Sequence, residues 1–194
     1  MSSKEIIGRR LILRPIREGD LQLLYEWRNE IHFRNRCSNR KYKVTFQEFI
    51  SEIRADFSKD RHEQWIILRK PSRGPVGTVY TYNFDKDGKH SFLSLYAVPR
   101  LWGSGLGVEC LALLAEYLFG EFELYKLYMD VYEYNARVVS ALTKAGLSVE
   151  GRFRGHRLLR GKRYDVVRFA LYPDVLFKHE KLIRSFQVHN AERR

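Results

Sequence analysis

Residues 95–109 read Leu-Tyr-Ala-Val-Pro-Arg-Leu-Trp-Gly-Ser-Gly-Leu-Gly-Val-Glu, and this stretch decides the fold. An apolar strand ends at Pro99, a turn with three glycines follows, and a helix begins directly after the turn. Glycine permits positive φ and a close approach of the backbone to a ligand. The first turn of a helix presents unpaired N–H groups and the positive end of the helix dipole. The stretch therefore predicts an anion site suited to a pyrophosphate.

Pro99 also bears on the strand before it. Proline has no backbone N–H and cannot continue a hydrogen-bonded ladder. We therefore expect the strand to part from a neighbour here, which frees backbone groups of Tyr96, Ala97 and Val98 for an extended ligand with amides. A free N–H near Val98 would also suit a developing oxyanion. A pyrophosphate joined to amides suggests coenzyme A.

The glycine pattern alone does not specify this ligand, because close packing of a helix on a strand also selects glycine. A dinucleotide site needs a parallel βαβ unit and an acidic residue about 20 positions later. Here the glycines follow antiparallel strands, and the nearest acidic candidate, Asp130, comes late. No Gly-Lys-Ser/Thr ending is present, which excludes a nucleotide-hydrolase loop.

The remaining pattern predicts an α/β (α+β) chain. Alternating residues predict a strand at 10–16, a helix follows Asp20, and Thr45 with Glu48 forms a capping-box pattern that opens a second helix. Further strands are expected at 64–68, 76–84, 90–98, 126–132, 148–153 and 163–172, and further helices at 104–119, 135–145 and from 173. This order predicts a mixed, mostly antiparallel central sheet of about seven strands with helices on both faces. We expect one domain at 8–172, with 173–194 as its C-terminal helical extension.

Composition limits the partners. The 194 residues carry a net charge of +12, with twelve Lys/Arg against five Asp/Glu from Glu150 onward, which favours anionic partners. No apolar run approaches the ~18 residues that cross a bilayer, and no secretory signal is visible. The two cysteines, Cys37 and Cys110, have no metal-ligand spacing, and Cys110 is expected to be a small core residue. We expect a cytoplasmic protein without metal or membrane contact, and no motif specifies its oligomeric state.

Three segments resemble one family. They are Arg100–Gly105, Asn135–Gly151, and Leu11–Asp20 followed by Tyr25–Asn29. With these segments the sequence resembles the GNAT superfamily of acetyltransferases from about residue 8 to 172, and within it the ribosomal-protein-alanine acetyltransferase (RimJ/RimL) branch. The resemblance implies the GNAT-like acyl-CoA N-acyltransferase fold, acetyl-CoA as co-substrate, and direct attack by a primary amine. The acceptor would be a protein N-terminal amine or the amino group of a small aminosugar, such as a nucleotide-linked one.

The resemblance also implies site residues. The strand end before Pro99 would bond the pantetheine arm, the turn would hold the pyrophosphate, and the Asn135 side chain would contact the cofactor unless it only caps its helix. The expected cofactor-binding residues are Tyr96, Ala97, Val98, Trp102, Gly103, Ser104, Gly105, Leu106, Gly107 and Asn135. The acceptor site is expected to involve Trp27, Arg28, Asn29, Tyr80, Tyr82 and His156. The polar groups weighed for catalysis are Glu133, Tyr134 and Ser140.

Two departures from the family pattern matter. Trp102 stands where a basic or polar residue is common, so Arg100 is expected to supply charge near the phosphates. Leu142 stands where many relatives have a tyrosine that protonates the leaving thiolate, which removes a side-chain general acid. A non-catalytic acyl-CoA-binding sensor is therefore one alternative. An RNA-binding module is another, but the sequence lacks the interleaved aromatics typical of one and so disfavours nucleic acid.

Overall fold

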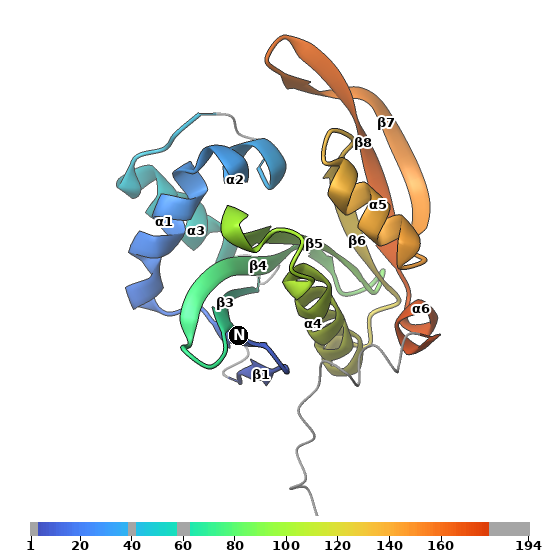
Figure 1. The fold of residues 1–194 in the computed structure, drawn as a ribbon, viewed down its shortest axis with the longest axis horizontal. Helices are drawn as coiled ribbons and strands as arrows, with labels where there is room; N and C mark the ends of the chain where they lie inside the picture. The colour runs from blue at the N-terminus through green and yellow to red at the C-terminus, as the bar shows by residue number, and fades with distance from the viewer. Residues whose placement is uncertain (1–3, 39–41, 58–62, 179–194) are drawn as a thin grey trace, which may run out of the picture.

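The computed structural model describes residues 4–38, 42–57 and 63–178, which form a single eight-stranded sheet with helices on both faces (Figure 1). The strands are β1 (Ile6–Ile7), β2 (Leu11–Pro15), β3 (Gln64–Arg69), β4 (Gly74–Asp85), β5 (His90–Ala97), β6 (Lys126–Tyr132), β7 (Ser148–Leu159) and β8 (Lys162–Leu171). The helices are α1 (Leu21–Asn29), α2 (Ile31–Arg36), α3 (Phe46–Phe57), α4 (Leu106–Phe122), α5 (Ala136–Lys144) and α6 (Pro173–Lys178), and two 3-10 turns are η1 (Glu18–Asp20) and η2 (Pro99–Leu101).

The sheet has the order β1-β2-β3-β4-β5-β6-β8-β7. All neighbours are antiparallel except β5 and β6, which are parallel and pair only over His90–Phe92 and Lys126–Tyr128. Beyond Phe92 and Tyr128 the two strands are no longer paired with each other. The sheet thus opens between β5 and β6, but seven residues before Pro99 and not at the proline as predicted.

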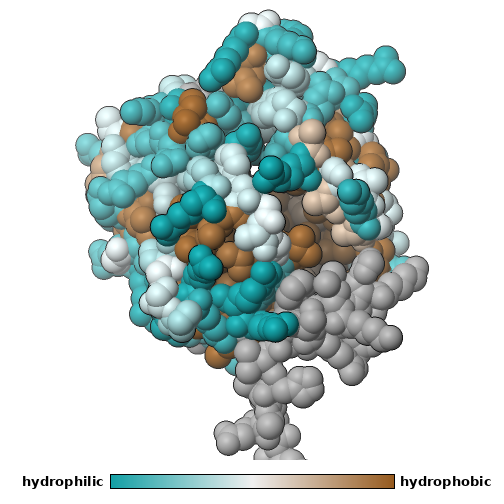
Figure 2. Space-filling view, viewed as in Figure 1, coloured by the Kyte–Doolittle hydropathy of each residue, from teal (hydrophilic) through white to brown (hydrophobic). Residues whose placement is uncertain are grey.

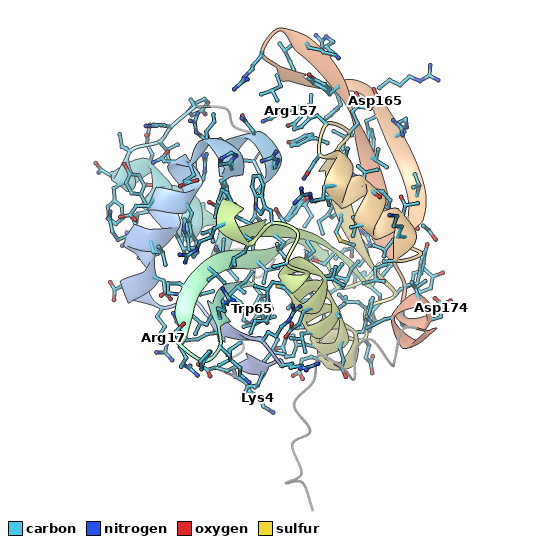
Figure 3. The ribbon with its side chains drawn as sticks, viewed as in Figure 1. Lys4, Arg17, Trp65, Arg157, Asp165 and Asp174 are labelled. Carbon is cyan, nitrogen blue, oxygen red and sulfur yellow. The ribbon has the colours of Figure 1, made fainter. Side chains whose placement is uncertain are left out.

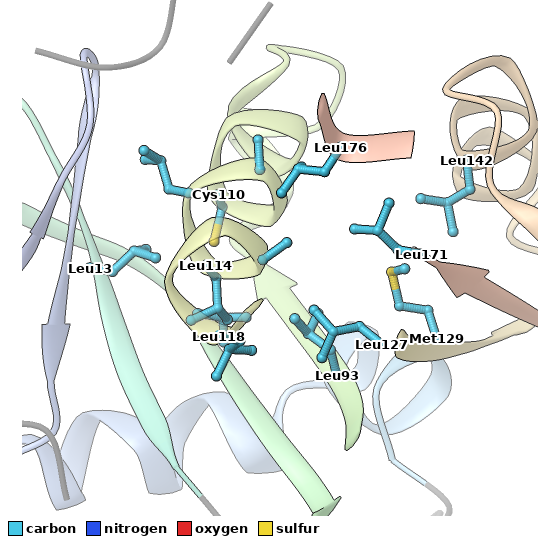
Figure 4. Packing of buried hydrophobic residues seen from close by; sticks show 14 of the residues in the cluster. Leu13, Leu93, Cys110, Leu114, Leu118, Leu127, Met129, Leu142, Leu171 and Leu176 are labelled. Carbon is cyan, nitrogen blue, oxygen red and sulfur yellow. The ribbon is translucent and has the colours of Figure 1, made fainter. Parts of the chain in front are cut away.

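Strand alternation divides the core into two layers. Leu93, Leu127 and Phe169 point to the face covered by α4, and α5 and α6 also pack on this layer (Figure 4). On the opposite face Ile66 and Tyr96 pack against α1, α2 and α3. Cys110 is fully buried in the α4 layer, as expected for a small core residue.

The predicted fold class is confirmed, with three local differences. The sheet has eight strands rather than about seven, because the two-residue β1 pairs with β2. The six-residue α2 was not predicted, since six residues are too few to show helical periodicity. β7 continues to Leu159 instead of ending at Phe153, because a register shift between Phe153 and Arg157 interrupts its alternation.

The predicted capping box is present: the Glu48 N–H donates to Thr45 Oγ1, and the Thr45 N–H donates to Glu48 Oε2. A helix begins at Pro173, as predicted, and is described as far as Lys178. The rest of the predicted C-terminal extension, 179–194, lies outside the described residues.

Candidate active site

The glycine turn has the conformation that its sequence requires. Gly103 and Gly105 have φ of 84° and 77°, in the left-handed region that side chains disfavour. Gly105 is the N-cap of α4 and provides no side chain to cap it; Ser104 Oγ accepts only the Leu106 N–H, at 3.3 Å. The Leu106 side chain is buried, whereas Gly107 is exposed with nothing within 4 Å of an added Cβ. The turn therefore offers backbone N–H groups, rather than side chains, to a ligand.

Two arginines that the sequence did not single out lie beside this turn. Nη1 of Arg10 donates to the Ser104 carbonyl at 3.0 Å, and its Nε donates to Glu109 Oε2 at 2.7 Å. A Cβ added to Gly103 would lie 3.0 Å from Nη1 of Arg137. Arg10 comes from the β1–β2 turn and Arg137 from the first turn of α5, so cations from two elements flank the glycines. Arg100, expected to supply this charge, lies exposed on η2.

The backbone before Pro99 corrects one expectation. The Val98 N–H donates to the Val76 carbonyl of β4 at 2.9 Å, so it is not free for an oxyanion. Because backbone groups alternate along a strand, those of Tyr96 also face β4, while those of Ala97 face the gap toward β6. Of the three predicted residues, Ala97 is therefore the one whose backbone groups are turned to the gap.

Two side chains reach carbonyls on the gap side of β5. Nε1 of Trp102 donates to the Ala97 carbonyl at 2.8 Å, and the Cys37 thiol donates to the Leu95 carbonyl at 3.4 Å. Burial raises the pKa of Cys37 to about 12, which keeps the thiol protonated. The Trp102 ring also contacts α2: the Arg36 guanidinium lies 4.3 Å from its centroid, and the His32 ring packs edge-on at 5.0 Å. Trp102 thus joins the glycine turn to α2.

Asn135 lies at the N-cap of α5 but makes no side-chain capping hydrogen bond. A purely capping role for this residue therefore has no support, and its amide remains available to a ligand. Together, the uncapped α4 turn, the two arginines and the parted strands fit a ligand that combines a diphosphate with amides. Figure 2 shows the surface hollowed between α4 and α5, with hydrophobic residues in the hollow.

The C-terminal end of α2 is fixed to the sheet by four side chains. Tyr80 and Tyr132 donate to the carbonyls of Cys37 and Ser38, at 3.0 and 3.3 Å. Tyr134 donates to the Asn35 carbonyl, and Arg157 to the Arg34 carbonyl at 2.9 Å (Figure 3). Burial raises the pKa of Tyr132 to about 12 and also raises the pKa of Tyr80 and Tyr134, so all three phenols keep the proton that they donate. These bonds satisfy carbonyls that a helix end leaves unpaired.

The residues expected at the acceptor site have mostly packing contacts. Trp27 is buried, 5.8 Å from the Tyr96 ring, and Asn29 exchanges two 2.9 Å hydrogen bonds with the backbone of Val44. Arg28 is buried, with Nε 3.7 Å from Glu52. Tyr80 holds α2, as described above. Tyr82 packs on the Phe92 ring, and His156 lies exposed on the β7–β8 hairpin.

The three residues weighed for catalysis have different surroundings. Glu133 accepts the Asp165 N–H at 2.9 Å, and Tyr134 bonds α2, so both have structural contacts. Ser140 is exposed on α5. Leu142, which has no hydroxyl, is buried in the core with 8% of its surface exposed.

A carboxylate that the sequence did not single out lies at the end of β5. Glu30, an exposed residue between α1 and α2, accepts the Tyr96 hydroxyl at 3.2 Å. A lone glutamate at a helix junction gives no sequence signal. Within the described residues no group of three His, Cys, Asp or Glu is arranged to hold a metal ion. No helix among them has the length and apolarity needed to cross a membrane.

A mixed sheet that parts beside a glycine turn and a helix N-terminus is the architecture of an acyl-CoA N-acyltransferase. The chain belongs to the acetyltransferase (GNAT) domain family, whose model matches residues 10–148. It is an acyltransferase that uses acetyl-CoA as co-substrate.

Relatives and solved structures agree with this family. The chain is 21% identical over 160 residues to spermidine N(1)-acetyltransferase of Escherichia coli (strain K12), covering 82% of this chain and 84% of that protein. The structure of spermidine N-acetyltransferase from Vibrio cholerae with CoA and spermine matches with a TM-score of 0.79 and 18% identity, over 87% of this chain and 98% of that one. RimL, a ribosomal L7/L12 α-N-protein acetyltransferase in complex with coenzyme A, matches with a TM-score of 0.76 and 14% identity, over 89% and 99%. Because both kinds of enzyme match, the RimJ/RimL branch stays a prediction.

Proposed function

We propose that this acetyltransferase acts on the primary amine of an anionic acceptor, either a protein N-terminal amine or a small aminosugar such as a nucleotide-linked one. The observation that carries the proposal is the charge of α2 and the segment around it. Residues 28–43 contain one acidic residue, Glu30, and six basic ones. Arg28 is buried beside Glu52, and the other five are Arg34, Arg36, Arg40, Lys41 and Lys43, of which Arg40 and Lys41 lie outside the described residues. A polycation such as spermidine, the acceptor named for the relatives, would be repelled by this segment, whereas an anion would be attracted.

Several described residues suit the groups of the co-substrate. We assign the diphosphate to the backbone of Gly103, Gly105 and Gly107, with Arg10 and Arg137 beside them. The Ala97 backbone and the Asn135 amide are assigned to the amide-bearing arm. Bound acetyl-CoA supplies the activated acetyl group, and the chain orients it against the acceptor, which provides much of the rate without a covalent intermediate.

The attacking amine must lose a proton, since alkyl amines titrate near ~10. We assign the removal of this proton to Glu30, because the Glu30 carboxylate is exposed where α2 meets the end of β5. Glu133, Tyr134 and Ser140 remain weaker candidates. Glu133 and Tyr134 already make structural hydrogen bonds, and Ser140 lies on the outer surface of α5.

A panel of amines tests the proposal by release of free thiol from acetyl-CoA. The panel should contain a peptide with a free N-terminus, a simple aminosugar, its nucleotide conjugate, and spermidine. We expect release with the peptide or the nucleotide conjugate, and little with spermidine. Spermidine as the best acceptor would overturn the anionic assignment. Thermal stabilisation by acetyl-CoA without thiol release from any amine would instead support the non-catalytic sensor.

A further inference from the structure

The β7–β8 hairpin is strongly basic and projects from the body of the protein (Figures 1 and 3). Residues 152–163 contain no acidic residue and six basic ones: Arg152, Arg154, Arg157, Arg160, Lys162 and Arg163. All six except Arg157 are exposed. An ordinary solvent-exposed surface usually mixes charges of both signs, whereas this segment carries positive charges only.

Most of this charge is not compensated within the described residues. Arg152 lies 3.1 Å from Asp165, which neutralises one cation. Among the described residues no carboxylate oxygen lies within ion-pair distance of Arg154, Arg160 or Lys162. The Gly155 N–H and Arg152 lower the pKa of Asp165, and the charge of Arg154 lowers it further, so Arg154 shares this carboxylate. Arg160 and Lys162, at the turn, therefore present cations whose counter-charges come from outside the described residues.

The hairpin is joined to the candidate active site near its turn, through Arg157, which pairs with Tyr164. Arg157 is 5% exposed, stacks 4.7 Å from the Tyr132 ring and donates to the Arg34 carbonyl of α2. The basic α2 segment and the basic hairpin thus lie on adjoining parts of the surface. Opposite the stretch of β7 from Arg152 to Leu159, β8 runs from Val167 to Lys162, which at ~3.3 Å per residue is roughly 17 Å, more than a simple aminosugar covers.

We propose that the β7–β8 hairpin is a docking surface for an acidic polypeptide. The inference rests on the proposed function, since the N-terminal amine of this polypeptide would be the acceptor. Among the described strands β7 is an outer strand of the sheet, so its outer backbone groups on either side of the irregularity at Phe153–Arg157 can pair with an extended chain. Arg154 and Arg160 beside that edge supply charge for Asp and Glu side chains.

The aromatic residues of the hairpin favour a polypeptide over single-stranded RNA, which needs open ring faces for base stacking. The Phe153 ring has the Arg168 guanidinium at 4.9 Å and the His156 ring at 5.8 Å. The Tyr164 ring has Lys162 at 5.1 Å and the Tyr134 ring at 4.9 Å. A cation over each ring limits stacking of a base on that face, while the Phe153 side chain stays 40% exposed, so an RNA probe belongs in the test.

The test uses the full chain without acetyl-CoA and three fluorescent probes of equal length. The probes are an N-terminally acetylated acidic peptide, a neutral peptide and a single-stranded RNA, followed by anisotropy at several salt concentrations. The acetylated N-terminus prevents the probe from acting as an acceptor. The test variant replaces Arg154, Arg160 and Lys162 with Gln. A matched control replaces Arg54, Arg69 and Lys86, which are exposed on α3, β3 and the β4–β5 turn, with Gln.

We expect the acidic peptide to bind more tightly than the neutral one, with an affinity that falls as salt rises. The hairpin variant should lose about tenfold in affinity, the sum of three exposed charge pairs, and the control less than about twofold. Equal losses in both variants, or tighter binding of RNA than of the acidic peptide, would overturn the proposal. Thiol release with the amine panel described above reports on the proposed function separately, so either can fail without the other.

Discussion

Arg10 links the glycine turn to the interior of the protein. Its partner Glu109 is fully buried on α4 and accepts both the Arg10 backbone N–H, at 2.8 Å, and its guanidinium. A buried carboxylate is costly unless it is paired. The same guanidinium bonds the Ser104 carbonyl, so one side chain both neutralises Glu109 and brings positive charge to the turn.

Arg10→Gln should therefore have two separable effects. We expect the KM for acetyl-CoA to rise about tenfold, and the free energy of unfolding to fall by about 3 kcal/mol, because Glu109 loses its ion pair. Adding Glu109→Gln should restore part of the stability but not the KM. Arg137→Gln, at an exposed residue, should raise the KM without loss of stability. Steady-state kinetics and denaturant unfolding distinguish these outcomes, and an unchanged KM in both arginine variants would refute the assignment.

Gly105→Glu should abolish acetyl-CoA binding, because the new side chain adds bulk and negative charge to an anion site. The matched control is Gly161→Glu, since Gly161 has the same φ of 77° in the β7–β8 hairpin and nothing within 4 Å of an added Cβ. Calorimetric titration with acetyl-CoA measures both. Retained binding in Gly105→Glu would mean that the diphosphate lies elsewhere.

Glu30→Gln should lower kcat by about a hundredfold, the usual contribution of a positioned proton acceptor, with the KM for acetyl-CoA unchanged. Glu26→Gln, at an exposed position on α1, is the control and should retain activity. A wild-type kcat in Glu30→Gln would return the assignment to Glu133, Tyr134 or Ser140.

At the scale of elements, α2 is the part of the acceptor side with the most links to the sheet. It is six residues long, too short to be a stable helix alone, and its last carbonyls are held by side chains from β4, β6, β7 and the residues after β6. Its position, and that of Arg36 over Trp102, therefore depends on these bonds.

Tyr134→Phe should remove one of these bonds at a cost of about 1 kcal/mol. The KM for the amine acceptor should rise several-fold while the KM for acetyl-CoA stays constant. Tyr128→Phe is a suitable comparison, because Tyr128 donates to Glu150, outside this set of bonds. We expect Tyr128→Phe to lose a similar amount of stability without a change in the KM for the acceptor. If the acceptor KM rose equally in both variants, the position of α2 would not be the cause.

More of the cofactor site than of the acceptor site could be predicted from the sequence. The Gly-Ser-Gly turn, Pro99 and Asn135 are local signals, and local φ preference or a missing N–H has a direct structural meaning. Arg10, Arg137 and Glu30 were missed because their positions depend on contacts between distant segments, such as that between Arg10 and Glu109, which are 99 positions apart in the sequence. The prediction of a free Val98 N–H was wrong because the β4–β5 register decides which side of a strand each backbone group faces.

At the scale of the whole molecule, stability should depend on acid pH through Glu150. Burial alone would raise its pKa, but hydrogen bonds from Tyr172, Lys126 and Tyr128 outweigh burial and lower the pKa to about 2. A carboxylate with a lowered pKa stabilises the fold above its unfolded pKa, near 4.5, and this contribution is lost as pH falls toward 2.

Glu150→Gln should thus be less stable than the wild type by about 1 kcal/mol at pH 7, a value reduced for solvent screening of a partly exposed group. The difference should shrink between pH 4.5 and 2. Thermal unfolding across this range is the measurement, with Glu123→Gln as the control, since the Glu123 side chain is 82% exposed. A difference that is constant with pH would show that charge at Glu150 is not responsible.

The two sides of the sheet are joined along β5 and β6 by only three residue pairs, whereas β6 and β8 are joined by six. Backbone hydrogen bonding between β5 and β6 is therefore sparse, and buried side chains of α4 pack with residues of both strands in one hydrophobic cluster. We therefore expect the sheet to be rigid on either side of the β5–β6 junction and more deformable at that junction. A co-substrate whose amides bond to the backbone between β5 and β6 would bridge the two halves of the sheet. The enzyme should therefore be most rigid while its co-substrate is bound.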